Sequence, residues 1–262
     1  MRQPTYYIPH GGGPCFFMDD PRGIWSGIAA FLHALPAGLP ERPRAILIVS
    51  GHWETFGGFA FTGNPKPGLI YDYSGFPAHT YQLRYDVPGD PALAEEAASL
   101  LRSAGLTAGV DPVRGLDHGV FVPLKVALPD ANVPVVEMSV ERSLDPALHL
   151  AAGRALAPLR DQGVLIVGAG MSFHNLRGYG DPRFTRPSED FDRWLIESIA
   201  LEPAERAERL THWQSAPAAR LSHPREEHLL PLLIAAGAAD SRGEHVFGER
   251  VLETAISGFR FS

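Results

Sequence analysis

Five of the eleven histidines stand where structural elements are expected to begin or end, beside glycine, serine or proline. They are His10, His52, His118, His174 and His228. Imidazole binds Zn, Fe, Cu and Ni, and it is also the usual general acid or base in enzymes. The chain has no His-x-His or His-Glu-x-x-His spacing. The positions alone therefore leave two interpretations open, which are a shared metal or acid–base site and unrelated packing roles.

The elements that would bring these histidines together are the strands of an α/β fold. Residues 45–49 and 164–167 are unbroken apolar runs, typical of strands buried on both faces. Each run leads into a glycine-containing turn and then a histidine, His52 or His174. Ligands bind at the carboxyl ends of the strands in open α/β sheets, so histidines from distant segments can meet there.

Alternating strand and helix patterns predict one α/β domain over residues 1–262, with a mixed, largely parallel sheet covered by helices on both faces. The predicted strands are residues 5–8, 45–49, 58–62, 81–85 as an edge strand, 106–110, 133–140, 163–168 and 251–261. The predicted helices are residues 22–35, 91–104, the segment after His118, 145–160, 188–200, a polar segment to about 219, and 224–237. The aromatic segment 71–85 is a candidate pocket wall.

Composition excludes several other classes of function. The net charge is −7 and there is no basic run, so we expect no nucleic-acid partner. Cys15 is the only cysteine, which excludes an internal disulfide and suits a reducing cytoplasm. No apolar stretch reaches about 18 residues, so we expect neither a signal peptide nor a membrane span. Neither Ser50 nor Ser172 lies in the G-x-S-x-G sequence of a nucleophilic serine, and Cys15 has no evident partner.

Taken together, five short motifs resemble the class III extradiol ring-cleavage dioxygenases, in particular their 4,5-DOPA dioxygenase branch. The resemblance spans nearly the whole chain, and the order of the motifs makes it specific. A Phe76-Pro77 pair between the second and third motifs fits the same branch. The motifs are His10-Gly11, Ser50-Gly51-His52-Trp53, Leu116-Asp117-His118-Gly119, Ser172-Phe173-His174-Asn175 and Glu227-His228-Leu229-Leu230-Pro231.

The resemblance implies a mononuclear non-haem metal held by His10, His52 and His228. His228 stands where the best-known ring-cleaving branch has a carboxylate, and His223, Glu226 and Glu227 are alternatives for this third ligand. The resemblance also implies that His174 is the general base and His118 a second active-site histidine. His79 and His223 remain possible supporting groups, whereas His33 and His149 are interpreted as structural or surface residues.

These implications favour an Fe(II)-dependent dioxygenase that opens a small catechol with O₂, with Zn also able to occupy the purified protein. Two alternatives remain open, namely a zinc hydrolase that uses the same histidines to activate water, and a metal-binding protein without redox chemistry. The presence of both His118 and His174 argues against the last, because a binding module needs no acid–base pair. A cytoplasmic protein, which could form a homodimer, is expected.

Overall fold

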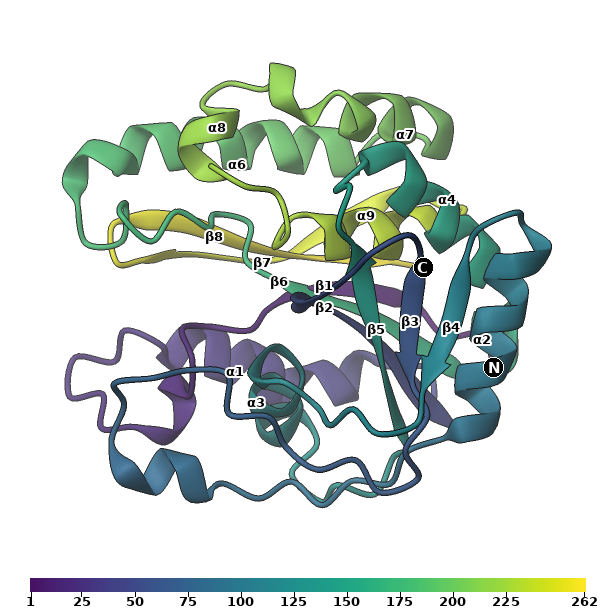
Figure 1. Cartoon of the computed structure of the whole chain (residues 1–262). Helices are drawn as coiled ribbons and strands as arrows, with labels where there is room; N and C mark the ends of the chain where they lie inside the picture. The colour runs from purple at the N-terminus through teal and green to yellow at the C-terminus, as the bar shows by residue number, and fades with distance from the viewer.

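The computed structural model describes residues 1–262, and a single eight-stranded sheet runs through the chain (Figure 1). The strands are β1 (Thr5–Pro9), β2 (Ala45–Thr55), β3 (Phe59–Thr62), β4 (Ala108–Asp111), β5 (Val135–Glu141), β6 (Val164–Gly170), β7 (Gly243–Val251) and β8 (Thr254–Phe261). Their order across the sheet is β4-β3-β5-β2-β6-β1-β8-β7. The central strands β5, β2, β6 and β1 are parallel, whereas β8 runs antiparallel to β1 and β3 antiparallel to β5. The predicted α/β class with a mixed, largely parallel sheet is confirmed.

Helices cover both faces of the sheet, as predicted. They are α1 (Ser26–Ala34), α2 (Pro91–Ser103), α3 (His118–Ala127), α4 (Pro146–Leu156), α5 (Pro158–Asp161), α6 (Thr185–Ile199), α7 (Pro203–Thr211), α8 (Ala219–Ser222) and α9 (Leu230–Gly237). In Figure 1, α1 and α3 lie below the sheet, and α4, α6, α7 and α9 lie above it. No helix has both the length and the hydrophobicity that a membrane crossing requires.

Strand β2 shows how the sequence builds the two hydrophobic layers. Ala45, Leu47 and Val49 belong to the core on one face, and Ile46 and Ile48 belong to the core on the other. Successive side chains of a strand point to opposite faces, so only a continuously apolar run can fill both layers. Each fully buried aliphatic side chain stabilises the fold by roughly 1.5–3 kcal/mol.

The end of β2 differs from the prediction, and the difference positions His52. The strand continues to Thr55 instead of ending at Val49. Its pairing with β5 is irregular there, because Val49 lies opposite Met138 while Glu54 lies opposite Val140. The additional residues of β2 form a bulge, a feature that bends a strand and redirects its side chains. The bulge carries His52 at the carboxyl-terminal edge of the sheet.

Several other predictions are corrected. Residues 81–85 form no edge strand, because Ala78–Gln82 is a 3₁₀ helix and residues 83–85 lie in no strand. The edge strands are β4, which overlaps the predicted strand 106–110, and β7, which we did not predict because its exposed positions carry mostly polar residues. The polar segment before residue 219 is divided into α7, a 3₁₀ turn and α8. The expected helices 22–35 and 224–237 begin later, at Ser26 and Leu230.

Candidate metal and catalytic site

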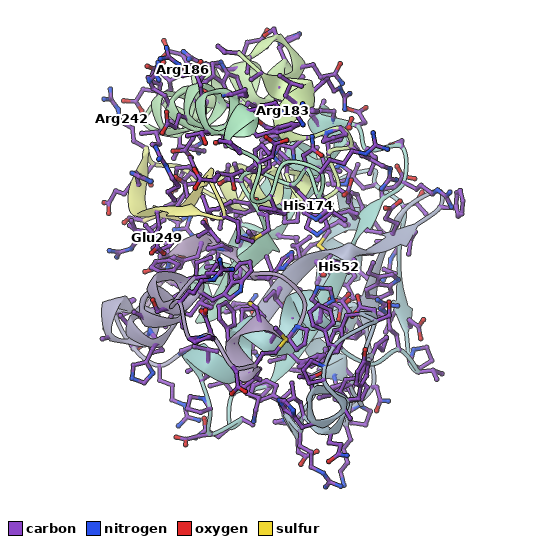
Figure 2. The ribbon with its side chains drawn as sticks, turned by 90° about the vertical axis from the view of Figure 1, so that its left-hand side faces the viewer. His52, His174, Arg183, Arg186, Arg242 and Glu249 are labelled. Carbon is purple, nitrogen blue, oxygen red and sulfur yellow. The ribbon has the colours of Figure 1, made fainter.

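The fold brings all five predicted histidines to one place, at the carboxyl-terminal edge of the central strands. The ring of His10 lies 5.0 Å from that of His52 and 5.1 Å from that of His228, measured between centroids. The Nε2 atoms of His52 and His228 are 3.1 Å apart. His118 lies 4.0 Å from His52, and His174 stacks on His228 at 3.5 Å between ring centroids. Both His52 and His174 line the same cavity, and Figure 2 shows them near the middle of the molecule, below the labelled arginines.

His10, His52 and His228 each direct Nδ1 toward an oxygen atom. The Nδ1 atom of His10 lies 2.8 Å from the Gly11 carbonyl oxygen, and that of His228 lies 3.0 Å from Glu227 Oε1. The Nδ1 atom of His52 is 3.6 Å from Asp72 Oδ2. The acceptors at Nδ1 of His10 and His228 favour the tautomer with its proton there, which leaves the Nε2 lone pair available to a metal. The His52–Asp72 contact is too long for a hydrogen bond.

The resulting arrangement leaves nitrogen lone pairs without partners. The Nε2 atom of His10 is buried and has no hydrogen-bond partner. The facing Nε2 atoms of His52 and His228 would repel one another unless a proton or a cation lay between them. His10, His52 and His118 also have ligand atoms within 4.8 Å of one another, as do those of His174, Glu227 and His228. The donor set therefore fits a divalent ion that prefers imidazole nitrogen.

Burial and mutual proximity keep these imidazoles neutral. Burial, reinforced by the neighbouring histidines, lowers the pKa values of His10 and His228 well below the usual range. Burial and the nearby His118 lower the pKa of His52 to about 4. Metal binding requires the neutral imidazole, so the fold presents these side chains in the form that a metal needs.

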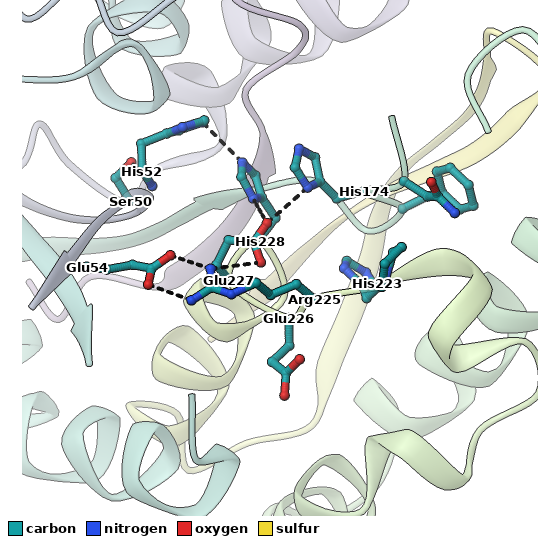
Figure 3. A network of polar contacts seen from close by, with 12 residues as sticks. Ser50, His52, Glu54, His174, His223, Arg225, Glu226, Glu227 and His228 are labelled. Carbon is teal, nitrogen blue, oxygen red and sulfur yellow. Dashed lines mark hydrogen bonds and ion pairs between the residues drawn. The ribbon is translucent and has the colours of Figure 1, made fainter. Parts of the chain in front are cut away.

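Glu227 contacts two histidines with the same oxygen atom. Its Oε1 lies 3.0 Å from Nδ1 of His228 and 3.2 Å from Nδ1 of His174 (Figure 3). Burial alone would raise the pKa of Glu227, but its interactions with His174 and Arg225 lower it overall. The carboxylate therefore stays ionised, and it can orient both rings at once.

Asp72 plays the corresponding part on the other side of the cluster. Its Oδ1 accepts hydrogen bonds from the backbone N–H of His118 at 2.9 Å and from Nδ1 of the same residue at 2.8 Å. Burial would raise the pKa of Asp72, but these bonds to His118 lower it overall. His118 is the first residue of α3, and Asp72 therefore fixes both its backbone and its ring.

A buried polar network supports the bulge and the start of α3 from below. Ser50 Oγ accepts a bond from the His52 backbone N–H at 3.2 Å and donates one to Asp117 Oδ1 at 2.8 Å. The Asp117 backbone N–H donates to Glu137 Oε2 at 3.1 Å, and Arg114 Nη2 contacts both carboxylates. Burial and the nearby Asp117 raise the pKa of Glu137 well above its usual value. This network joins the segments that carry His52 and His118.

The loop that carries His228 lies directly against the ends of β2 and β6. A Cβ atom on Gly51 would meet the Glu227 carbonyl oxygen at 2.6 Å, and one on Gly170 would overlap the His228 carbonyl oxygen. The hydroxyl of Tyr7 donates a hydrogen bond to that carbonyl at 2.7 Å. Glycine at these strand ends is therefore required for the close approach that places His228 in the cluster.

The histidine cluster opens into a cavity of about 750 Å³. One part of its wall is aromatic, with Trp25, Tyr73 and Phe76, and Tyr73 lies edge-on to His118 at 5.7 Å between centroids. The predicted aromatic wall is confirmed for this part of segment 71–85. Glu54 and Arg225 lie on the polar part of the wall. A planar ring with adjacent polar groups fits a cavity of this size and lining.

Other candidate residues have different roles. His223 is fully buried outside the cluster, and its Nε2 bonds the Ser172 carbonyl oxygen at 2.9 Å. Glu226 pairs with Arg220, and His79 bonds the Phe17 carbonyl oxygen. Cys15 lines the cavity, but burial raises the pKa of its thiol to about 12, which makes it a poor nucleophile.

Comparison with known proteins identifies the family. Residues 4–259 match the family described as the catalytic LigB subunit of aromatic ring-opening dioxygenase. The chain belongs to the LigB family. LigB proteins are class III extradiol dioxygenases that use a mononuclear metal, so the expected family and enzyme class are confirmed.

Three relatives and one solved structure show which members of the family this LigB protein resembles. It is 42% identical over 254 residues to the dioxygenase tasH of Hapsidospora irregularis, covering 90% of this chain and 78% of the relative. It is 37% identical to the 4,5-DOPA dioxygenase extradiol of Beta vulgaris, covering 90% and 86%. The corresponding protein of Escherichia coli K12 is 35% identical, covering 92% and 87%. The crystal structure of an uncharacterized E. coli K12 protein, JW3007, aligns over 100% of both chains with a TM-score of 0.79 and 27% identity.

Sequence reasoning missed the carboxylates that orient the histidines of this LigB protein. Asp72 is the only acidic residue among residues 71–81, which was the one available signal for it. Glu227 was considered only as an alternative ligand, and its contact with His174 depends on a loop packing that the sequence does not reveal. The network of Asp117, Glu137 and Arg114 was not predicted, although Asp117 lies in the third motif, because separated charged residues usually lie on the surface.

Proposed function

We propose that the protein is an extradiol ring-cleavage dioxygenase that opens a small catechol with O₂, using one Fe(II) held by His10, His52 and His228. The observation that carries the proposal is the set of three Nε2 lone pairs, at least two of them facing each other, in a cavity that also holds His118 and His174. Bound iron supplies the centre at which the diol and O₂ are activated together. The relatives named 4,5-DOPA dioxygenase support a catecholic substrate.

His174 is proposed as the general base for the catechol. Its Nδ1 faces Glu227 at 3.2 Å, which leaves Nε2 as the atom that accepts a proton from a diol hydroxyl. The nearby carboxylate stabilises the imidazolium that results, as a carboxylate does for other catalytic histidines. The ring is stacked on His228, so it stands beside the proposed metal ligand and at the cavity wall.

His118 is proposed as the second acid–base group. Asp72 holds its Nδ1 at 2.8 Å and so directs a single nitrogen, Nε2, toward other partners. Protonated at Nε2, His118 can donate a hydrogen bond or a proton to oxygen in the cavity. The aromatic side chains Tyr73 and Phe76 exclude water from one side of the ring-binding space.

Oxygen uptake tests the proposal directly. Protein loaded anaerobically with Fe(II) should consume one O₂ per catechol and give a ring-opened product. Zn-loaded protein should bind catechols without consuming O₂, because Zn has no redox chemistry. Hydrolysis of an ester or amide by the Zn form, with no catechol cleavage by the Fe(II) form, would replace this proposal with the hydrolase alternative.

A further inference from the structure

We propose, resting on the function proposed above, that the cavity selects substrates by charge and discriminates against catechols that carry a carboxylate on the ring. Neutral and cationic ring substituents are favoured. The inference concerns the substituent, since the two diol oxygens occupy the histidine cluster. It follows from the charges on the cavity wall and from how these charges are already paired.

Negative charge predominates among the side chains of this wall, and in the proposed complex the two diol oxygens offset the charge of the ion. The carboxylates Glu54, Asp72 and Glu227 line the cavity, and Arg225 is the only lysine or arginine that does so. Asp72 and Glu227 are committed to the histidines, so their charges remain in place when a substrate enters. A carboxylate on a bound ring would lie among like charges in a partly desolvated space, where repulsion is stronger than in water.

Arg225 offers no free positive charge to offset this repulsion. Its Nη2 contacts Glu54 Oε2 at 2.6 Å, and its Nη1 pairs with Glu54 Oε1, which forms a two-pronged ion pair (Figure 3). Its Nη1 also lies 3.5 Å from Glu227 Oε2. The guanidinium therefore faces two carboxylates before any substrate binds. An incoming carboxylate would have to displace Glu54 to reach it.

The remaining wall accepts neutral or cationic groups. Trp25, Tyr73 and Phe76 present aromatic surface, and burial raises the pKa of the Tyr73 hydroxyl to about 12, so it carries no charge. Aromatic faces attract cations and repel anions placed over them. An amide or ammonium substituent therefore finds favourable contacts on the same wall that disfavours a carboxylate.

A cation without an ion-pair partner lines a second cavity. A neighbouring cavity of about 510 Å³ shares His174, Leu176, Arg225 and Glu227 with the first, and Arg177 lines it. Arg177 is exposed and forms no ion pair. A carboxylate at the end of a long substituent can extend toward Arg177, because the two cavities share part of their walls. The discriminating ligands must therefore be short.

Three catechols of similar size, which differ in the charge of the ring substituent, test the inference. They are 3,4-dihydroxybenzoate, 3,4-dihydroxybenzamide and 3,4-dihydroxybenzylamine, with negative, neutral and positive substituents. Calorimetric titration of the Zn-loaded holoprotein measures affinity without consuming the ligand. The benzamide and the benzylamine should each bind roughly tenfold or more tightly than the benzoate, the effect of one added like-charge repulsion.

Glu54→Gln is the decisive variant, because it releases Arg225 from its charged partner. The affinity for benzoate should rise roughly 5- to 20-fold, and that for benzamide should change less than about twofold. The substitution leaves the diol acidity of each ligand unchanged, so the change in the affinity ratio reports the wall charge. Glu205→Gln, an exposed carboxylate on α7, is the matched control and should change neither value.

The results distinguish a failure of the charge inference from a failure of the proposed function. Benzoate binding as tightly as benzamide to the unmodified protein would overturn the charge inference, as would an unchanged ratio in Glu54→Gln. Cleavage of benzoate in preference to the other two by the Fe(II) form would also overturn it, while supporting ring cleavage itself. Failure of the Fe(II) form to cleave any catechol would instead overturn the proposed function, and the charge inference with it.

Discussion

Two carboxylates hold the two proposed acid–base histidines, but they are connected to the rest of the site in different ways. Asp72 hydrogen-bonds only His118, through both its ring and its backbone N–H, and lies 3.6 Å from the nearest nitrogen of His52. Glu227 contacts His174 and His228 with one oxygen. Glu227 therefore links the proposed base to a proposed metal ligand, whereas Asp72 supports the other acid–base histidine with a weaker connection to the metal ligands.

The largest expected effect is loss of the metal from the shared centre. His52→Ala removes a buried imidazole whose Nε2 faces that of His228, and we expect the purified protein to retain less than about a tenth of the metal of the unmodified protein. Metal analysis after anaerobic Fe(II) loading and desalting measures this. His33→Ala, on the exposed face of α1, should load normally. Full occupancy in His52→Ala would exclude this residue as a ligand.

The next effect separates the base from the ligands. His174→Ala should retain the metal and bind catechol, while single-turnover cleavage falls by roughly 10²–10⁴, the usual range for loss of a general base. Rapid mixing of the Fe(II)–catechol complex with O₂ measures the rate. If His174→Ala lost metal as completely as His52→Ala, His174 would be a ligand and His118 the remaining candidate base.

Variants of Glu227 and Asp72 test whether the two carboxylates differ in their connection to the metal. Glu227→Gln should weaken metal affinity by roughly 10- to 100-fold and also slow turnover, because it disturbs a proposed ligand and the proposed base. Asp72→Asn should slow turnover with a change in metal affinity of less than about threefold. Competition with a chromophoric chelator gives both affinities. Equal losses of metal affinity in the two variants would show that both carboxylates support metal binding to the same extent.

The sequence predicted the central strands and the five histidines, but not the groups that orient them. The apolar runs of β2 and β6 predicted the central strands, because a strand buried on both faces has to be continuously apolar. The motifs predicted which five histidines meet. Asp72 and Glu227 were not assigned their roles, since these depend on loops whose paths are set by tertiary packing. The bulge that carries His52 was likewise hidden, because no single residue of Ser50–Trp53 requires it.

The smallest expected effect is on the pH dependence of stability in the metal-free protein. Burial lowers the pKa values of both His52 and His149 to about 4 from the ordinary 6.5. Between these values the unfolded chain binds more protons than the folded protein, so the free energy of unfolding should decrease as pH falls from 6.5 toward 4.

Urea unfolding of metal-free protein at several pH values checks this linkage. His149 lies outside the cluster, with its Nδ1 2.7 Å from the Asp145 carbonyl oxygen. His149→Gln should therefore make the decrease shallower without changing metal uptake. A midpoint that stays constant from pH 6.5 to 4.5 would be inconsistent with these buried neutral imidazoles.

The identity of the third ligand is the central claim, because the geometry brings both His118 and His228 to His10 and His52. Anaerobic Fe(II) titration of His118→Ala and His228→Ala, followed by metal analysis, tests it most directly. The account predicts that His118→Ala binds one Fe(II) with affinity near that of the unmodified protein, and that His228→Ala fails to retain it. Retention by His228→Ala together with loss from His118→Ala would contradict the account and make His118 the ligand.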